Sequence, residues 1–467
     1  MSRRDPWIIV GGGASGLAAA FLLRRLGIGA VVVEQGRAIG GRMGTVRLGT
    51  RSLDCGGKNI GRRYTLFREF AASLGTHPLE HFGLNSSQIV DGHITTFDAG
   101  DRWRTLAGLA RGLSSKDALR FGRLLWKVNA DESTGYLGSP RARALAERYG
   151  ALRADEYFSP AFCERIIRPM TVRMNGAEPD EAYVGNLASN VRMILDTYEQ
   201  FTNGMAPLLA AFMACYDVRL DTATEGLIVE RGRVTGVQVR YGDGRTGELR
   251  GAGVILATPA HAAAALTEPV LPGLAGELRS VAYYPVTLVV AEYERPVFTS
   301  GVRALVFGRD EVISNAGAYG VNDLHLVRYT FSGRASRGWI TDRTSPSDLL
   351  ARAEAGLARH IPFDPGSRRR FVTRHFHTGL CAYTARHGRF MDRVAEQLEQ
   401  VAGLHLTGDY MQGASIEACF RSASACAARI AHREQRSGAA RAGSAQAGAQ
   451  REQIRVPGRL AVHTRPH

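Results

Sequence analysis

Near its start the chain reads Trp7-Ile8-Ile9-Val10-Gly11-Gly12-Gly13-Ala14-Ser15-Gly16. The apolar run at 7–10 is typical of a buried parallel strand, and a glycine-rich turn follows it immediately. Residues 17–26 are helix formers with apolar side chains on every side, and glycines at 27 and 29 end that helix before a second apolar run, Ala30 to Val33. The segment therefore predicts a strand–helix–strand unit of the Rossmann type.

The turn has the glycine spacing of a dinucleotide phosphate site. Gly11 permits the tight turn, Gly13 lets the backbone approach a pyrophosphate, and Gly16 lets the helix pack closely on the strand. Ala14 and Ser15 lie at the helix N-terminus, where the N–H groups and the helix dipole favour phosphate. These five residues are therefore candidate contacts to a dinucleotide cofactor.

An acidic residue and a second glycine pair follow. Glu34 ends the second strand about twenty positions after the glycines, where a carboxylate accepts hydrogen bonds from ribose hydroxyls, and Gln35 lies beside it. Gly40-Gly41-Arg42 is not part of the ordinary nicotinamide fingerprint. Here the sequence resembles the flavin-containing amine oxidase, protoporphyrinogen oxidase and phytoene desaturase superfamily, and most closely its protoporphyrinogen oxidase-like branch. The resemblance implies FAD as the cofactor, with Gly41 and Arg42 near its pyrophosphate and flavin.

Further segments resemble signatures of this superfamily and occur in the family's order; they are 203–209, 256–260 and 406–417. The resemblance implies that Gly408 and Asp409 contact the ribityl or pyrophosphate region of FAD. It also implies that Ser415 and Ile416, at a helix N-terminus, face the flavin, and that Thr224 lies near the adenine.

Three residues are candidates for substrate chemistry. The loop 54–61 resembles the family loop beside the flavin ring, which makes Gly57 a candidate flavin contact and Lys58 both a flavin contact and a catalytic residue. Lys58 could polarise a carbonyl, bind a carboxylate or stabilise reduced flavin; the alternative is that it pairs with an acid or lies in solvent. Tyr383 and His387 belong to a segment that resembles a protoporphyrinogen oxidase signature, and they could position a substrate or move a proton.

The reaction follows from the resemblance. Amine oxidases of this superfamily place a lysine in the strand that corresponds to 287–296, and this chain has none there. We therefore expect an FAD-dependent oxidoreductase that dehydrogenates a C–C or C–N bond of a hydrophobic small metabolite, with dioxygen or a quinone as electron acceptor. An amine or amino-acid oxidase and a redox-neutral isomerase or cyclase remain alternatives.

Composition and charge exclude several other classes. The formal net charge is +15, but the arginines are spread along the chain without a basic block interleaved with aromatics, which argues against nucleic-acid binding. His375 and His377 lack supporting ligands nearby in sequence, so we expect no metal site. The six cysteines form no C-x-x-C pair, and no apolar run reaches the ~20 residues of a spanning helix. The few residues before the first strand lead us to expect no signal peptide. We expect a cytoplasmic protein without an integral membrane segment; its oligomeric state is not predicted.

A chain of 467 residues is long enough for two lobes. We expect the α/β class: a Rossmann-type FAD-binding domain with a mixed α+β substrate domain. The predicted boundaries are 1–70, 205–270 and 395–436 for the FAD-binding domain, 71–204 and 271–394 for the substrate domain, and 437–467 for a disordered tail. Within these, 64–209 is predicted to be mostly helical, and 217–257 to form a β-meander.

Overall fold

The computed structural model describes residues 5–82, 85–90, 92–98 and 114–453. Its helices are α1 (Ala14–Arg25), α2 (Thr65–Ser73), α4 (Ser115–Ala130), α5 (Pro140–Tyr149), α6 (Ala154–Tyr157), α7 (Pro160–Phe162), α8 (Arg168–Asn175), α9 (Leu187–Ile194), α10 (Ala206–Cys215), α11 (Ala260–Thr267), α12 (Pro272–Arg279), α13 (Arg334–Trp339), α14 (Pro346–Ala358), α15 (His387–Glu399), α16 (Asp409–Gln412) and α17 (Ile416–Gln453). Its strands are β1 (Trp7–Val10), β2 (Ala30–Val33), β3 (Thr45–Leu48), β4 (Arg51–Asp54), β5 (Ile60–Gly61), β6 (Leu79–His81), β7 (Asn85–Val90), β8 (His93–Asp98), β9 (Tyr198–Phe201), β10 (Val218–Arg219), β11 (Thr222–Glu230), β12 (Arg233–Tyr241), β13 (Thr246–Arg250), β14 (Gly253–Leu256), β15 (Ala282–Tyr293), β16 (Ala304–Val306), β17 (Asn315–Ala318), β18 (Leu326–Phe331), β19 (Arg368–Tyr383) and β20 (Leu404–Leu406).

A five-stranded parallel sheet with the strand order β10-β2-β1-β14-β20 forms the centre of one lobe. The predicted strand–helix–strand unit is confirmed: β1, α1 and β2 follow one another, and β1 pairs in parallel with β2 and β14. Both faces of the sheet are covered, which explains the continuous apolar runs. Ile9, Val32 and Ile255 pack against α1 and α17, while Ile8 and Val254 face β12, α11 and α12.

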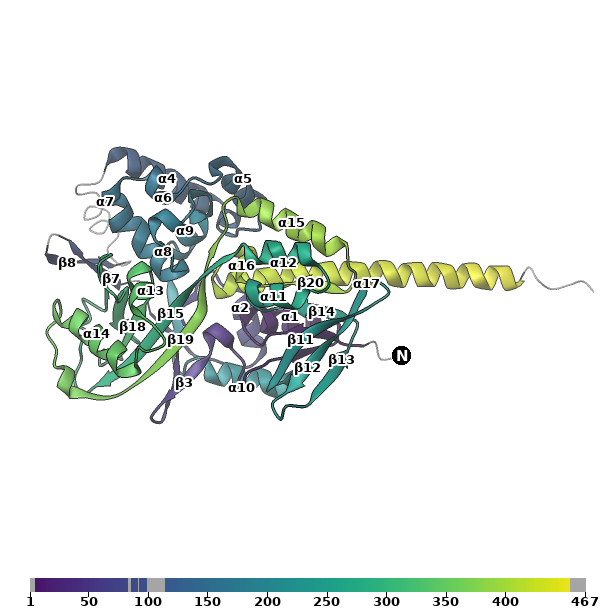
Figure 1. Cartoon of the computed structure of the whole chain (residues 1–467), viewed down its shortest axis with the longest axis horizontal. Coiled ribbons are helices and arrows are strands. Elements are labelled where there is room, and N and C mark those ends of the chain that lie inside the picture. The colour runs from purple at the N-terminus through teal and green to yellow at the C-terminus, as the bar shows by residue number, and fades with distance from the viewer. Residues whose placement is uncertain (1–4, 83–84, 91, 99–113, 454–467) are drawn as a thin grey trace, which may run out of the picture.

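The predicted meander differs from the structure in its membership. β10 and β14, which we expected in the meander, belong to the parallel sheet instead. The meander proper is β11-β12-β13, which lies beside that sheet (Figure 1). Thr222–Glu230 is a single strand with bulges, which keep the strand paired where its alternation is interrupted.

The second lobe is built on a seven-stranded sheet with the order β19-β15-β18-β17-β16-β7-β8. One face packs against α14, and the helices α4 to α9 form a separate cluster beside the sheet (Figure 1). The prediction that 64–209 is mostly helical was incomplete, because β6 to β9 lie within it and β7 and β8 extend this sheet. Short polar strands at a sheet edge carry a weak hydrophobic pattern, so the sequence did not reveal them.

The helix α17 continues past the predicted boundary at 437, as far as Gln453, and projects from the body of the protein (Figure 1). The predicted disorder of 437–453 therefore differs from the structure; alanine-rich sequence has a high intrinsic helix propensity. Residues 454–467 lie outside the described residues. Within the described residues, no helix is both long enough and apolar enough to cross a bilayer.

Candidate functional site

A cavity of about 980 Å³ extends from the carboxyl ends of the parallel strands to the seven-stranded sheet and the helical cluster. Every residue that the sequence analysis proposed for cofactor binding lines it, except Gly16. A Cβ added to Gly16 would lie 1.9 Å from the carbonyl oxygen of Gly11, so Gly16 serves the close approach of α1 to β1. The cavity is large enough for a cofactor and a substrate together.

The turn after β1 leaves backbone open to the cavity. Gly11 has a φ of +106°, which favours glycine, and it begins the turn. A Cβ added to Gly13 would meet nothing within 4 Å, so a ligand can approach the backbone there. Ala14 and Ser15 follow at the start of α1, and no side chain caps this helix end. The N–H groups of the first turn are thus available to bind an anion.

Glu34 is fixed at the end of β2 by two backbone groups. Its Oε2 accepts a hydrogen bond from the N–H of Gly12 at 2.7 Å, and its Oε1 accepts one from Gly36 at 2.8 Å. Thr224 and Thr258 line the same end of the cavity, and their hydroxyl oxygens are buried without a hydrogen-bond partner among the described residues. Buried polar atoms without partners indicate a missing ligand with donors and acceptors, as the adenosine part of FAD has.

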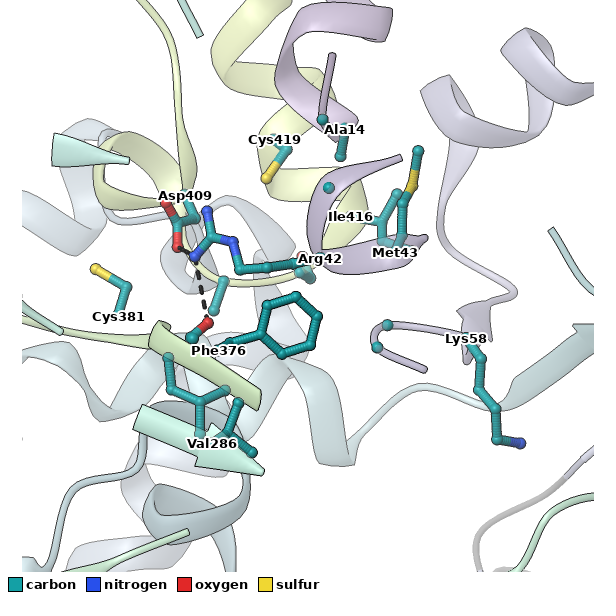
Figure 2. A pocket seen from close by; sticks show the side chains of 18 of the residues that line it. Ala14, Arg42, Met43, Lys58, Val286, Phe376, Cys381, Asp409, Ile416 and Cys419 are labelled. Atoms are coloured by element: carbon teal, nitrogen blue, oxygen red, sulfur yellow. Dashed lines mark hydrogen bonds and ion pairs between the residues drawn. The ribbon is translucent and has the colours of Figure 1, made fainter. Parts of the chain in front are cut away.

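Arg42 and Asp409, which lie far apart in the sequence, form an ion pair on the cavity wall, with 2.6 Å between Nη1 and Oδ2 (Figure 2). The hydroxyl of Tyr283 donates to the other oxygen of Asp409 at 2.7 Å. Gly408 and Asp409 begin α16, and Ser415 and Ile416 lie at the start of α17 on the same wall. Segments that lie far apart in the sequence therefore line one cofactor-sized space.

Glu417, which follows Ile416, has a different role from its neighbours. Its carboxylate is fully buried and accepts hydrogen bonds from the N–H groups of Leu66 and Phe67, at 3.3 and 3.1 Å. It therefore caps the N-terminus of α2. This contact anchors α17 and so fixes where its first turn faces the cavity.

Lys58 lies in the loop after β4, at a part of the cavity away from the Arg42–Asp409 pair (Figure 2). Its ammonium donates to Gln200 Oε1 at 2.5 Å and to the carbonyl of Tyr319 at 2.6 Å, and it lies 3.8 Å from the centre of the Phe82 ring. Burial lowers the pKa of Lys58 and the positive charge of Arg328 lowers it further, to about 7.

Tyr383 and His387 are placed in the protein core and do not line this cavity. The Tyr383 hydroxyl is buried without a hydrogen-bond partner among the described residues. His387 Nε2 donates to the carbonyl of Tyr410 at 2.8 Å, and burial lowers its pKa to about 4. The structure therefore does not bring these two residues together with Lys58.

Two arginines on the cavity wall were not singled out from the sequence. Arg173 lies on α8 and Arg328 on β18. The sequence signal that could have identified Arg328 is a charged residue within the apolar strand 325–331. No comparable signal marks Arg173, because an arginine on an amphipathic helix is usually exposed. Among the described residues, no three histidine, cysteine or acidic side chains gather as a metal site.

Residues 14–431 match the family model described as flavin containing amine oxidoreductase. A stretch of 153 residues is 32% identical to the flavin-containing amine oxidase B of Mus musculus and covers 29% of this chain. That stretch spans 28% of the length of the mouse protein.

Solved structures are similar over nearly the whole chain. Putrescine oxidase with bound putrescine has a TM-score of 0.71 at 18% identity, covering 92% of this chain and 99% of that one. A fatty acid isomerase from P. acnes that produces CLA has a TM-score of 0.64 at 13% identity, covering 92% and 99%. At these identities the likeness shows a shared fold.

Proposed function

Since the chain belongs to the flavin-containing amine oxidoreductase family and uses FAD, we propose that it removes two hydrogen atoms across a C–C or C–N bond of a small, largely apolar molecule. The observation that carries this proposal is the single cavity that joins the cofactor region to the wall of the second lobe. Phe82, Leu288 and Met170 on that wall provide apolar contacts for the substrate.

We propose that FAD lies along the first half of the cavity, where the residues fit its parts. The backbone of residues 11–15 and the N-terminus of α1 would hold the pyrophosphate, Glu34 and Gln35 the ribose, and Thr224 the adenine side. The remaining proposed contacts are Gly41, Arg42, Gly57, Gly408, Asp409, Ser415 and Ile416. When bound, FAD supplies the two-electron acceptor at its N5, and dioxygen or a quinone is the proposed final acceptor.

Lys58 is the proposed proton-transfer residue. A neutral amine has two N–H donors and one lone pair, and Gln200 and the Tyr319 carbonyl are placed to accept both donors. The lone pair on Nζ is then free to take the proton that the substrate loses along with its hydride. A pKa of about 7 makes both protonation states accessible at neutral pH.

The visible spectrum of the purified protein tests this function first. A flavin band that is bleached in anaerobic titration with one class among amines, porphyrinogens and polyenes would identify the type of bond. A colourless protein that cannot be reconstituted with FAD would refute the proposal.

Amine oxidation is a second candidate, favoured by the match to the mouse amine oxidase. Hydrogen peroxide and ammonia released from simple amines would establish it. The structural likeness to a fatty acid isomerase favours a third, redox-neutral reaction; activity that requires prior flavin reduction but consumes no acceptor would establish that one. We also propose a cytoplasmic location, because all six cysteines are free.

A further inference from the structure

The cavity wall carries a large excess of positive charge. Six cationic side chains line it against two carboxylates, Glu34 and Asp409. Both carboxylates lie at the cofactor end, where Glu34 is held by backbone N–H groups and Asp409 by Arg42. The six cationic residues are Arg42, Lys58, Arg173, Arg303, Arg328 and Arg374. On the wall of the second lobe, Arg173 and Arg328 form no ion pair with a carboxylate of a described residue.

The position of Arg328 follows from the alternation of side chains between the two faces of β18. Val327, Tyr329 and Phe331 pack into the core under α14, so Arg328 projects from the opposite face of the strand, into the cavity. Its Nη1 donates to the carbonyl of Gly56 at 2.9 Å. No carboxylate of a described residue forms an ion pair with it, so most of its five N–H donors remain available.

Arg173 approaches the same cavity from α8. Its Nη1 contacts the hydroxyl of Ser86 at 3.4 Å, and among the described residues no carboxylate pairs with it. Burial lowers the pKa of Arg173, and the like charge of Arg328 lowers it further, so the two guanidinium groups repel each other across the cavity.

Elsewhere this protein pairs its buried arginines with acids. Arg168 is 2.8 Å from Glu178, and Arg192 is 3.2 Å from Glu132. Arg173 and Arg328 are partly buried. A charge that is withdrawn from water without a partner is costly, so two such arginines facing one cavity indicate a counter-charge that enters with a ligand.

We infer that Arg173 and Arg328 bind an anionic oxygen group of the substrate, a carboxylate or a phosphate monoester, at the end of the cavity remote from the adenosine site. This inference rests on the proposed function and names the substrate class of that same cavity. The apolar part of the substrate lies against Phe82 and Leu288. A protonated amine without an acidic group is repelled by this wall.

Calorimetric titration of the FAD-loaded protein with matched probes tests the inference. Benzoate and benzamide have nearly the same shape but differ in charge. Phenyl phosphate represents the other candidate group, a phosphate monoester. We expect benzoate or phenyl phosphate to bind at least ~10-fold more tightly than benzamide, as charge-assisted pairs with arginine require. The tighter of the two anions identifies the acidic group.

The variants Arg173→Gln and Arg328→Gln should each weaken anion binding by roughly 10-fold or more and leave benzamide binding unchanged. Arg374→Gln is the matched control, because it removes the same charge from the same cavity at a different place. The native Arg374 side chain contacts the carbonyls of Thr45 and Gly41, near the proposed cofactor site. If a glutamine variant does not fold, Arg173→Lys or Arg328→Lys keeps the charge, loses the bidentate fork, and should weaken anion binding by a smaller factor.

Equal affinity for benzoate, phenyl phosphate and benzamide would overturn the inference, as would anion affinities that both arginine variants leave unchanged. Calorimetry does not depend on turnover, so a yellow protein whose flavin is bleached by substrate but which shows no anion preference would refute this inference alone. A protein that binds no FAD would refute the proposed function instead.

Discussion

Replacing Lys58 with methionine should remove a titration near neutral pH. The ordinary lysine pKa is 10.5 and that of Lys58 is about 7, a difference that corresponds to about 5 kcal/mol against the charged form in the folded protein. The unfolded chain holds this proton more tightly, so the folded state gains stability as the pH rises from about 7 towards 10.5. Below about 7 the folded protein carries the full cost of a buried charge.

The composition of the chain makes the titration easy to observe. The sequence has three lysines, Lys58, Lys116 and Lys127. Labelling lysine with ¹³C at Cε therefore gives three NMR signals, and the Lys58→Met variant assigns one of them by its absence. We expect the assigned signal to change with a midpoint near 7.

The same NMR titration distinguishes the two causes of the lowered pKa of Lys58, which are burial and the positive charge of Arg328. Arg328→Gln should raise the midpoint, because it removes a like charge, whereas Arg240→Gln, an exposed arginine paired with Glu225, should not move it. A midpoint near 10.5 for the Lys58 signal would refute the reasoning that burial controls this residue. A midpoint near 7 that Arg328→Gln leaves in place would refute the coupling to Arg328 alone.

Four further predictions concern the proposed cofactor region and the core. Gly13→Val should fold, because residue 13 has extended backbone and open space around its Cβ, but its purified form should lack flavin absorbance. Asp409→Asn leaves Arg42 without its carboxylate and should destabilise the protein by roughly 2–3 kcal/mol in denaturant unfolding; an unchanged midpoint would contradict the importance of this pair. Tyr383→Phe should alter turnover by less than about twofold, since its hydroxyl lies in the core outside the cavity and has no hydrogen-bond partner among the described residues that meets the distance and angle criteria of a hydrogen bond. His387→Asn should keep any inflection of the rate near neutral pH, which Lys58→Met should abolish.

Local sequence patterns were sufficient for the strand, turn and helix that begin the proposed cofactor site. The run from Trp7 to Gly16 specifies strand, turn and helix within a few residues, and each glycine has a physical role that can be read without the structure. Asp409 and Ile416 were identified differently, from the resemblance of segment 406–417 to a signature of the superfamily.

The substrate half could not be derived in this way. Lys58 was identified because it occupies an unusual position in a recognisable loop, but its partners Gln200 and Tyr319 lie far from it in the chain. Arg173 and Arg328 line the same cavity only because a helix packs beside a sheet. Local sequence patterns do not indicate such long-range proximity. Tyr383 was selected by a motif, although its side chain lies in the core.

The order of strands in the parallel sheet also bears on how the chain folds during synthesis. β1 and β2 emerge first, but β14 cannot pair with β20 until residues 404–406 have been made. Until then the apolar edge of β14 remains open to pairing with other chains. Contacts so distant in sequence slow folding, because a large loop must close before they form. A ribosome-bound chain that stops before β20 would therefore be unable to retain flavin and would be prone to aggregate.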